Sequence, residues 1–458
     1  MNLHGPVRVI DSANPGTATV ILSLDAWKEV AVAPTIHSLT VLPAKAGAKD
    51  EPVSPNLITS LPHPDKKAYM GHAAFSADSS RLFTTGYPSG VVQIWDVAAR
   101  REVRRIETPP GLRGSADYAL LTPDWQTLYV PVERRSVKPF ERDGKRQYRI
   151  EHAGEVRVWD IASGKGKNSL LPVSGSAPVY AQLAPGGQFL LCVERPSYDT
   201  SNQGAPTDET MAWDLASGKK WKLTEGFAVP AFAPDGKTVA VRLYDRDRKT
   251  SAVNLLDFPS GKILATVTCS EKDRRFDVGS ISPDGNLLSV YLNGKKGQPM
   301  EVTFFDAKGL TERGKLLGKS NPEQWGGGSG LFTPDSSQFV ALDMAGNVFI
   351  WNVAEQRVTR TFALNGETLT GKLAISPDGK TLAVGWSPKM DKDVDTNEKP
   401  DPQDLPQPRI SLIDLAGEDA SRVLTAPHGY PGQLAFSPDG KTLAFGGAGA
   451  VHLFDLTK

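Results

Sequence analysis

The sequence lacks the features that many classes of protein require. It has only two cysteines, Cys192 and Cys269, which is too few for a disulfide framework or a cysteine-based zinc site. Cys192 lies in an apolar strand, where we expect a buried thiol. No apolar run approaches the roughly 18 residues of a membrane span, and no basic start followed by an apolar core marks a signal peptide. These absences predict a cytoplasmic protein without a membrane partner.

Net charge and catalytic motifs are also missing. The 52 basic residues balance the 52 acidic ones, which argues against nucleic acid as the main partner. We find no Gly-x-Ser-x-Gly elbow, His-Glu-x-x-His pair, phosphate-binding Gly-Lys-Ser/Thr loop or Cys-x-x-Cys pair. The seven histidines are scattered singly along the chain. The sequence therefore predicts a non-enzymatic protein that holds no cofactor and no metal.

What the sequence does contain is a repeat of two alternating phrases. The first is a turn phrase, Ser/Thr/Ala-Pro-Asp-Gly or a near copy, and the second is a strand-end phrase, Trp-Asp or a near copy. The turn phrases are Ser76-Ala77-Asp78, Thr122-Pro123-Asp124, Ala184-Pro185-Gly186, Ala233-Pro234-Asp235-Gly236, Ser282-Pro283-Asp284-Gly285, Thr333-Pro334-Asp335, Ser376-Pro377-Asp378-Gly379 and Ser437-Pro438-Asp439-Gly440. The strand-end phrases are Trp95-Asp96, Trp159-Asp160, Trp213-Asp214, Leu256-Asp257, Phe305-Asp306, Trp351-Asn352, Ile413-Asp414 and Phe454-Asp455. Repetition at about 40 to 50 residues is typical of solenoids, propellers and arrays.

Each phrase has a local physical cause. In the turn phrase, Pro fixes one backbone angle, Asp bonds to nearby amides, and Gly accepts the positive φ that follows. Apolar strands flank this turn and predict a hairpin. The strand before Trp95 alternates and carries apolar groups on both sides, which predicts sheets packed between neighbouring sheets. A more variable fourth strand follows each strand-end phrase.

This pattern resembles the WD-repeat β-propeller family over residues 57–458, and its turn phrases are also similar to those of Tol-type and peptidase-associated propellers. The best matches are Val91 to Asp96, Val156 to Asp160 and Val348 to Asn352. Only Gly71-His72 matches the family's Gly-His pair, so we expect blades held by apolar packing and turns. The resemblance implies an all-β fold and a single propeller of four-stranded blades.

The blade count depends on the N-terminal segment, residues 1–56, which has no clear turn phrase. Residues 7–11 look like a third strand without its turn phrase. We predict eight blades, with the N-terminal region closing the last one, because an open blade would leave an exposed sheet edge. The alternative is seven blades plus a distorted hairpin, with residues 1–56 as an accessory segment packed outside.

Several residues are expected to have structural roles. The aromatic rings of the strand-end phrases should lie in the core, and His72 should make a hydrogen bond at a blade junction. The set comprises Trp95, Asp96, Trp159, Asp160, Trp213, Asp214, Trp351 and His72. Replacing Trp159 by Ala is expected to cost about 3–5 kcal/mol if that ring is buried.

Three repeats are longer than the others, each between its second and third strands, at residues 133–153, 194–209 and 387–409. The family resemblance implies that these connections share one face of the ring. Insertions on one face of a repeat ring often mark the binding face. We therefore predict an interaction scaffold, itself a monomer, whose protein or peptide partner binds there.

The first insertion has the most suggestive composition. It holds seven basic and four acidic residues, with aromatic residues between them. One interpretation is a patch for an acidic partner, made by Arg134, Arg135, Lys138, Phe140, Arg142, Lys145, Arg146 and Tyr148. The other is a solvated hairpin that turns at Asp143-Gly144, with Tyr148 and Ile150 packed on the blade.

The other insertions say less. The third is acidic and Pro-rich, and Asp391, Asp393 and Asp395 begin like a calcium loop, but Thr396 and Pro402 stand where the loop needs Gly and Glu. The second is polar and uninformative. A different function also remains open: a small-molecule-binding or hydrolase-type propeller, or the propeller part of a larger peptidase-like protein. That function would require acidic or histidine residues gathered at the ring's axis.

Overall fold

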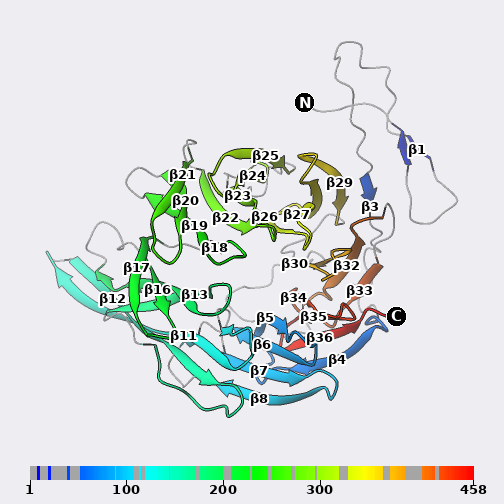
Figure 1. Ribbon diagram of the computed structural model, residues 1–458. Helices are drawn as coiled ribbons and strands as arrows, with labels where there is room; N and C mark the ends of the chain where they lie inside the picture. The colour runs from blue at the N-terminus through cyan, green and yellow to red at the C-terminus, as the bar shows by residue number, and fades with distance from the viewer. Residues whose placement is uncertain are drawn as a thin grey trace.

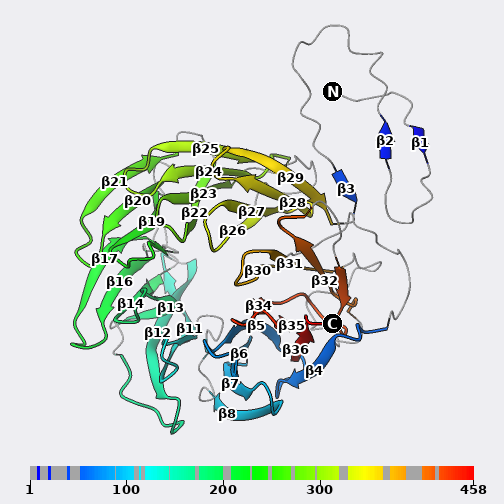
Figure 2. The ribbon, with the colours of Figure 1, turned by 45° about the vertical axis from the view of Figure 1, so that its right-hand side comes forward.

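The computed structural model of this chain is a ring of eight antiparallel sheets around a common centre (Figure 1). It describes residues 8–10, 19–21, 39–41 and 52–458, except 88, 108–112, 115–118, 144, 171–174, 200–207, 227–229, 246–249, 270–273, 294–296, 319–327, 365–371, 388–404 and 418–421. The predicted all-β, eight-bladed β-propeller is confirmed, and the seven-blade alternative is wrong. Each sheet has its first strand towards the centre and its last strand outside (Figure 2).

The blades follow one another along the chain. Blade 1 contains β5 (Tyr69–Phe75), β6 (Arg81–Tyr87), β7 (Val91–Asp96) and β8 (Arg101–Glu107). Blade 2 contains β10 (Leu120–Leu121), β11 (Thr127–Arg142) and β12 (Lys145–Asp160), with β9 (Arg113–Gly114) and β15 (Tyr198–Asp199) paired to its long hairpin. Blade 3 contains β13 (Ser176–Leu183), β14 (Phe189–Pro196), β16 (Glu209–Asp214) and β17 (Lys220–Glu225). Blade 4 contains β18 (Ala231–Phe232), β19 (Thr238–Asp245), β20 (Thr250–Asp257) and β21 (Ile263–Thr268).

The second half of the ring repeats this arrangement. Blade 5 contains β22 (Arg275–Ile281), β23 (Leu287–Asn293), β24 (Glu301–Asp306) and β25 (Glu312–Leu317). Blade 6 contains β26 (Gly328–Phe332), β27 (Gln338–Asp343), β28 (Asn347–Asn352) and β29 (Arg357–Ala363), with β3 (Leu39–Val41) added in parallel to β29. Blade 7 contains β30 (Lys372–Ile375), β31 (Thr381–Trp386), β32 (Arg409–Asp414) and β33 (Arg422–Thr425). Blade 8 contains β34 (Leu434–Phe436), β35 (Thr442–Gly446), β36 (Ala450–Asp455) and β4 (Leu57–Pro62).

The ring closes through β4, which comes from the N-terminal part of the chain and pairs with β36 at the C-terminal end. The strand that closes the ring is therefore neither the candidate at residues 7–11 nor any part of residues 1–56, since β4 begins at Leu57, directly after that segment. That segment contains β1 (Arg8–Ile10), which pairs with β2 (Thr19–Ile21) in a separate two-stranded sheet. Asn56 Nδ2 donates to the backbone oxygens of Asp455 at 3.0 Å and Lys458 at 3.1 Å, so side-chain bonds support the closing pair.

The turn phrases form a recurring hydrogen-bonded turn between first and second strands. In blade 7, Ser376 Oγ donates to Asp378 Oδ1 at 2.6 Å and accepts the N–H of Thr381 at 2.9 Å. Asp378 Oδ1 also accepts the N–H of Lys380 at 3.1 Å. The same bonds occur in the turns that begin at Ser76, Thr122, Ser282, Thr333 and Ser437. Because Ser or Thr supplies the hydroxyl, this turn explains the first residue of the phrase.

The core lies between the blades. The described chain has eight buried apolar clusters, and each one joins two neighbouring blades around the ring. One of them joins blades 8 and 1 through Leu61, Leu82 and Leu453, so the closing junction is packed like the others. The strands are thus covered on both faces, as the apolar pattern on both sides of the third strands predicted.

The strand-end phrases contribute to both the core and a turn. Trp95, Trp213 and Trp351 are buried, whereas Trp159 is half-buried at the blade 1–blade 2 cluster. Trp95 Nε1 donates to Thr84 Oγ1 at 3.0 Å within its blade. The acidic residues close the turn between third and fourth strands: Asp96, Asp160 and Asp214 accept backbone N–H groups of Ala99, Ser163 and Ala216 at 2.8–2.9 Å.

Candidate interaction face

The first insertion forms the outer half of the β11/β12 hairpin, which we call the arm (residues 133–154). The two strands pair without interruption from Thr127↔Asp160 to Arg142↔Lys145, where Asp143 begins the turn at a φ of 52°. The arm extends away from the ring beside blade 3 (Figure 1). The predicted hairpin turning at residue 143 is confirmed, and the insertion lies between the second and third strands as expected.

The register of the arm divides its side chains between two faces, because directly opposed residues share one face of a sheet. The basic face carries five cations against one carboxylate: Arg134, Lys138, Arg142, Lys145, Arg149 and Glu151. The opposite, apolar face carries Val137, Pro139, Tyr148 and Ile150, with two balanced charge pairs, Glu133 and Arg135 near the root and Glu141 with Arg146 near the tip. The eight residues predicted as one patch therefore divide. Arg134, Lys138, Phe140, Arg142 and Lys145 lie on one face, and Arg135, Arg146 and Tyr148 lie on the other.

The root of the arm is fixed on both edges. β9 pairs with Val132 and Glu133 on the β11 side, and β15 pairs with Arg149 and Ile150 on the β12 side. Ile150 is buried as predicted, but Tyr148 is 40% exposed. His152 is buried and stacks on Tyr198 at a ring distance of 6.3 Å, so the first insertion packs on the second.

Ion pairs order several charged groups of the arm. Lys138 Nζ lies 2.8 Å from Glu151 Oε2, and this contact lowers the pKa of Glu151. Arg149 Nε lies 3.7 Å from Asp199 Oδ1 in β15. Burial lowers the pKa of His152, whose Nδ1 is 4.0 Å from Glu133 Oε2. Within the described residues, no acidic group comes within 4.0 Å of Arg134 or Lys145.

The remaining insertions are described in part. The second begins at the end of β14 and reaches β15, where Ser197 Oγ accepts the N–H of His152 at 2.8 Å. Arg195 binds Asp208 through two bonds of 3.1 Å, and this pair raises the pKa of Arg195. Most of the third insertion, including the acidic residues from 391 to 404, lies outside the described residues. It joins β31 to β32, which is again a second-to-third connection.

The hydrogen-bonding histidine at a blade junction is His63, which the sequence analysis missed, and not the predicted His72. His63 follows β4 in blade 8 and hydrogen-bonds Ser89 Oγ of blade 1 through Nε2 at 3.0 Å. His72 lies in β5, where its ring meets Phe83 edge-on at 5.7 Å and burial lowers its pKa. Its Nδ1 has no hydrogen-bond partner in the described part of the chain. No sequence signal marked His63, because the strand before it, residues 57–62, carries neither repeat phrase.

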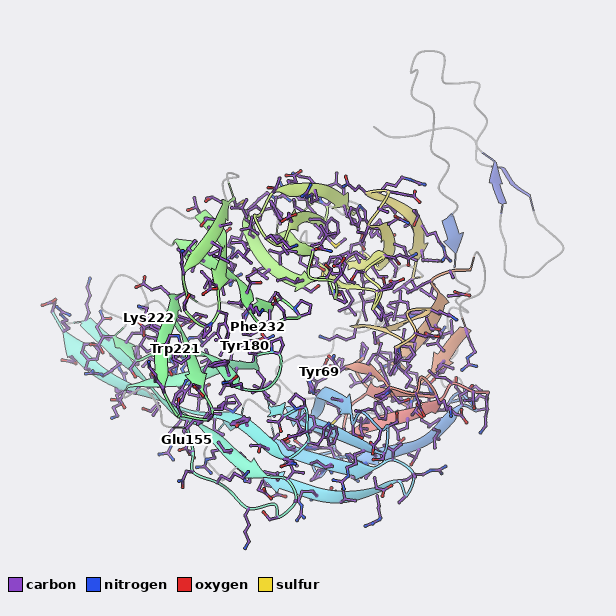
Figure 3. All side chains as sticks on the ribbon, in the orientation of Figure 1. Tyr69, Glu155, Tyr180, Trp221, Lys222 and Phe232 are labelled. Carbon is purple, nitrogen blue, oxygen red and sulfur yellow. The ribbon has the colours of Figure 1, made fainter. Side chains whose placement is uncertain are left out.

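The centre of the ring was the site that the enzyme alternative required. Tyr69, Tyr180 and Phe232 lie on inner strands around it (Figure 3). Burial raises the pKa of Asp277 in β22, but Arg242 of blade 4 binds this carboxylate. Over the described ranges, no three His, Cys, Asp or Glu residues gather as a metal site would require. Nor do those ranges hold a helix with the length and hydropathy of a membrane span.

The eight blades and their turns define the class: the chain has the β-propeller fold of WD40-type domains. The C-terminal WD40 domain of Sif2 shares this fold with a TM-score of 0.57 at 12% identity, covering 87% of this chain and 97% of that domain. Hydrazine synthase of Kuenenia stuttgartiensis aligns over 87% of this chain and 98% of its own, at 16% identity and a TM-score of 0.48.

A curated relative also matches in sequence. It is the U3 small nucleolar RNA-associated protein 18 homolog of Mus musculus, 24% identical over 253 residues, or 50% of this chain. The match covers 45% of the mouse protein, so this chain spans less than half of that relative. No protein-family model matches the chain.

Proposed function

We propose that this propeller is a non-enzymatic interaction scaffold whose protein partner binds on the face that carries residues 133–153, 194–209 and 387–409. The observation that carries this proposal is the pairing of β12 with β15, which joins two of the three insertions into one structure on that face. A projecting hairpin fixed on both edges is a preorganised surface, and preorganisation lowers the entropic cost of binding. The exposed Val137 and Tyr148 add apolar contact area to it.

The register of the arm allows a precise deletion. Val132 and Glu155 are directly paired, so residues 133–154 can be replaced by Asn-Gly, which makes a two-residue hairpin turn. Affinity purification from native lysate with this variant should lose a partner that the wild type retains. The control variant replaces Lys237, Lys380 and Lys441 by Glu, which reverses their charges. These lysines lie in turns between first and second strands, on the opposite face of the ring. An identical partner list for the wild type and the deletion would contradict the proposal.

A second candidate is a component of an RNA–protein particle, and it rests on the mouse relative whose name associates it with a small nucleolar RNA. The same purification distinguishes the two functions, because the bound fraction can be treated with ribonuclease. A partner that survives ribonuclease supports direct protein binding and the predicted absence of nucleic acid. Loss of the partner with the RNA, and accumulation of the tagged chain in a nucleolus rather than the cytoplasm, would favour the particle.

A further inference from the structure

The positive charge of the first insertion is not spread over the arm. The five cations and one carboxylate of the basic face give it a net charge of +4, Asp143 at the turn adds −1, and the opposite face balances its two cations with two carboxylates. Of the basic-face cations, Lys138, Arg149 and Arg142 have acidic neighbours at 2.8, 3.7 and 4.0 Å. Arg134 near the root retains an exposed, uncompensated charge within the described residues. This one-sided charge favours an acidic ligand on that face.

Along the arm, one edge of β11 pairs with β12, and the other edge, on the side of β9 and β10, is open among the described residues. β9 covers this second edge only at Val132 and Glu133, and no described strand pairs with it from Arg134 onward. An unpaired strand edge presents backbone N–H and C=O groups that a further strand can bind. Pro139 has no N–H, so this ladder extends from Arg134 to Lys138 before it is interrupted.

The one-sided positive charge and the unpaired edge of β11 together favour one kind of ligand. We infer that the arm binds an extended acidic segment of a partner protein, added as a strand along β11 at residues 134–138. Alternate residues of an added strand lie on one face, so acidic residues at every second position would meet the basic face. Their neighbours would lie beside Val137, which is 52% exposed on the apolar face. This inference rests on the proposed function, and it adds the chemistry of the partner and its binding mode.

Two peptides of identical composition test the pattern. One alternates Glu and Thr over ten residues, and the other has five Glu followed by five Thr. Added as a strand, the alternating peptide should bind the wild-type protein about tenfold or more tightly than the block peptide. Methylation of alternate backbone nitrogens on the ladder side should abolish this advantage. Equal binding of the two peptides, or no binding of either, would overturn the inference.

Two charge-matched double variants test the face. R134E/R142E changes the basic face and R135E/R146E changes the opposite one, each by the same total charge. We expect the first pair to weaken the alternating peptide about tenfold or more and the second to leave it within about twofold. Equal losses would mean general electrostatic attraction and would overturn the inference. Tighter binding of a ten-nucleotide single-stranded RNA, lost only in R134E/R142E, would overturn it in favour of nucleic acid.

The outcomes separate this inference from the proposed scaffold. If the purified partner is lost when the arm is deleted but retained by R134E/R142E, the scaffold stands and the acidic-segment inference fails. If deletion of the arm loses no partner, the scaffold on this face fails whatever the peptides show.

Discussion

Ser79 of blade 1 accepts a hydrogen bond from the backbone N–H of Asp439 in blade 8, at 3.2 Å and across 360 residues of sequence. A hydrogen bond of the same kind joins blades 6 and 5, where Ser336 Oγ accepts the N–H of Asp284 at 3.0 Å. Both serines occupy the positive-φ position of the turn, at 61°, where other turn phrases have Gly. The junction that closes the ring thus uses a contact found within the continuous chain.

Replacing Ser79 by Ala should lower the free energy of unfolding by about 1 kcal/mol, since it removes one hydrogen bond and retains the backbone conformation. Ser336→Ala is the matched control at an internal junction, and we expect a loss of similar size. Urea denaturation of both variants gives the comparison. If Ser79→Ala leaves the free energy of unfolding unchanged while Ser336→Ala lowers it, the hydrogen bond across the closing junction does not stabilise the ring.

Gly86 makes room for the second contact of the closing junction. A Cβ added there would lie 2.5 Å from Nε2 of His63, the atom that binds Ser89. Gly86→Ala should therefore destabilise the protein by about 1–3 kcal/mol, the usual cost of overpacking. Gly309→Ala is the control, because nothing lies within 4 Å of its added Cβ. Equal denaturation midpoints for the two variants would show that His63 moves aside without cost.

The sequence predicted the blades better than it predicted their closure. Ser-Pro-Asp-Gly and Trp-Asp mark turns whose bonds are local, so first, second and third strands could be placed by inspection. The closing strand at residues 57–62 is a lone outer strand and carries neither phrase. Its partner is almost 400 residues away, and no local pattern encodes that pairing.

The two faces of the arm were partly visible in the sequence. The dipeptide Asp143-Gly144 predicts a two-residue turn, such a turn pairs Arg142 with Lys145 as observed, and every other pair follows from that one. Counting charges over the whole insertion concealed this division, because the two faces were added together. The packing of His152 on Tyr198 could not be predicted, since it joins two insertions from different blades.

Removing the ring of Trp351 should lower the free energy of unfolding more than removing any other strand-end tryptophan. The Trp351 ring is fully buried and stacks on Phe304 of blade 5 at 3.9 Å. Trp351→Ala should cost about 3–5 kcal/mol in the free energy of unfolding. Trp159→Ala should cost less, because Trp159 is half-buried. Equilibrium denaturation tests the order, and an equal loss for both would mean that exposure does not decide the cost.

The turn carboxylates predict acid sensitivity below about pH 4. A hydrogen bond from Ser76 lowers the pKa of Asp78 to about 2, and bonds from Ser376 and Ser437 lower the pKa values of Asp378 and Asp439. Their folded pKa values lie below the unfolded ones, so their stabilisation is complete above about pH 4 and is lost as the pH falls towards 2.

Removing the three hydroxyls tests this cause. The variant with Ala at positions 76, 376 and 437 should be less stable at pH 5 and should lose less stability between pH 5 and pH 2.5 than the wild type. Urea denaturation at both values measures the difference. Parallel losses in the two proteins would attribute acid unfolding to other carboxylates.

Protonation of His452 should cause a separate loss of folding stability, at a higher pH than that of the turn carboxylates. His452 is buried in β36, where its Nδ1 lies 2.9 Å from Ser60 Oγ of the closing strand, and burial lowers its pKa to about 4. The unfolded chain binds this proton near pH 6.5, so folding stability is complete above that value and declines as the pH falls towards 4.

His452→Asn keeps a polar partner for Ser60 and removes the titration. We expect this variant to lose less stability than the wild type between pH 7.5 and pH 4.5. Ser60→Ala, which removes the bond but keeps the imidazole, should retain the wild-type slope. If the Asn variant retains that slope instead, the dependence comes from His63, His72 and His152, the other histidines whose pKa burial lowers.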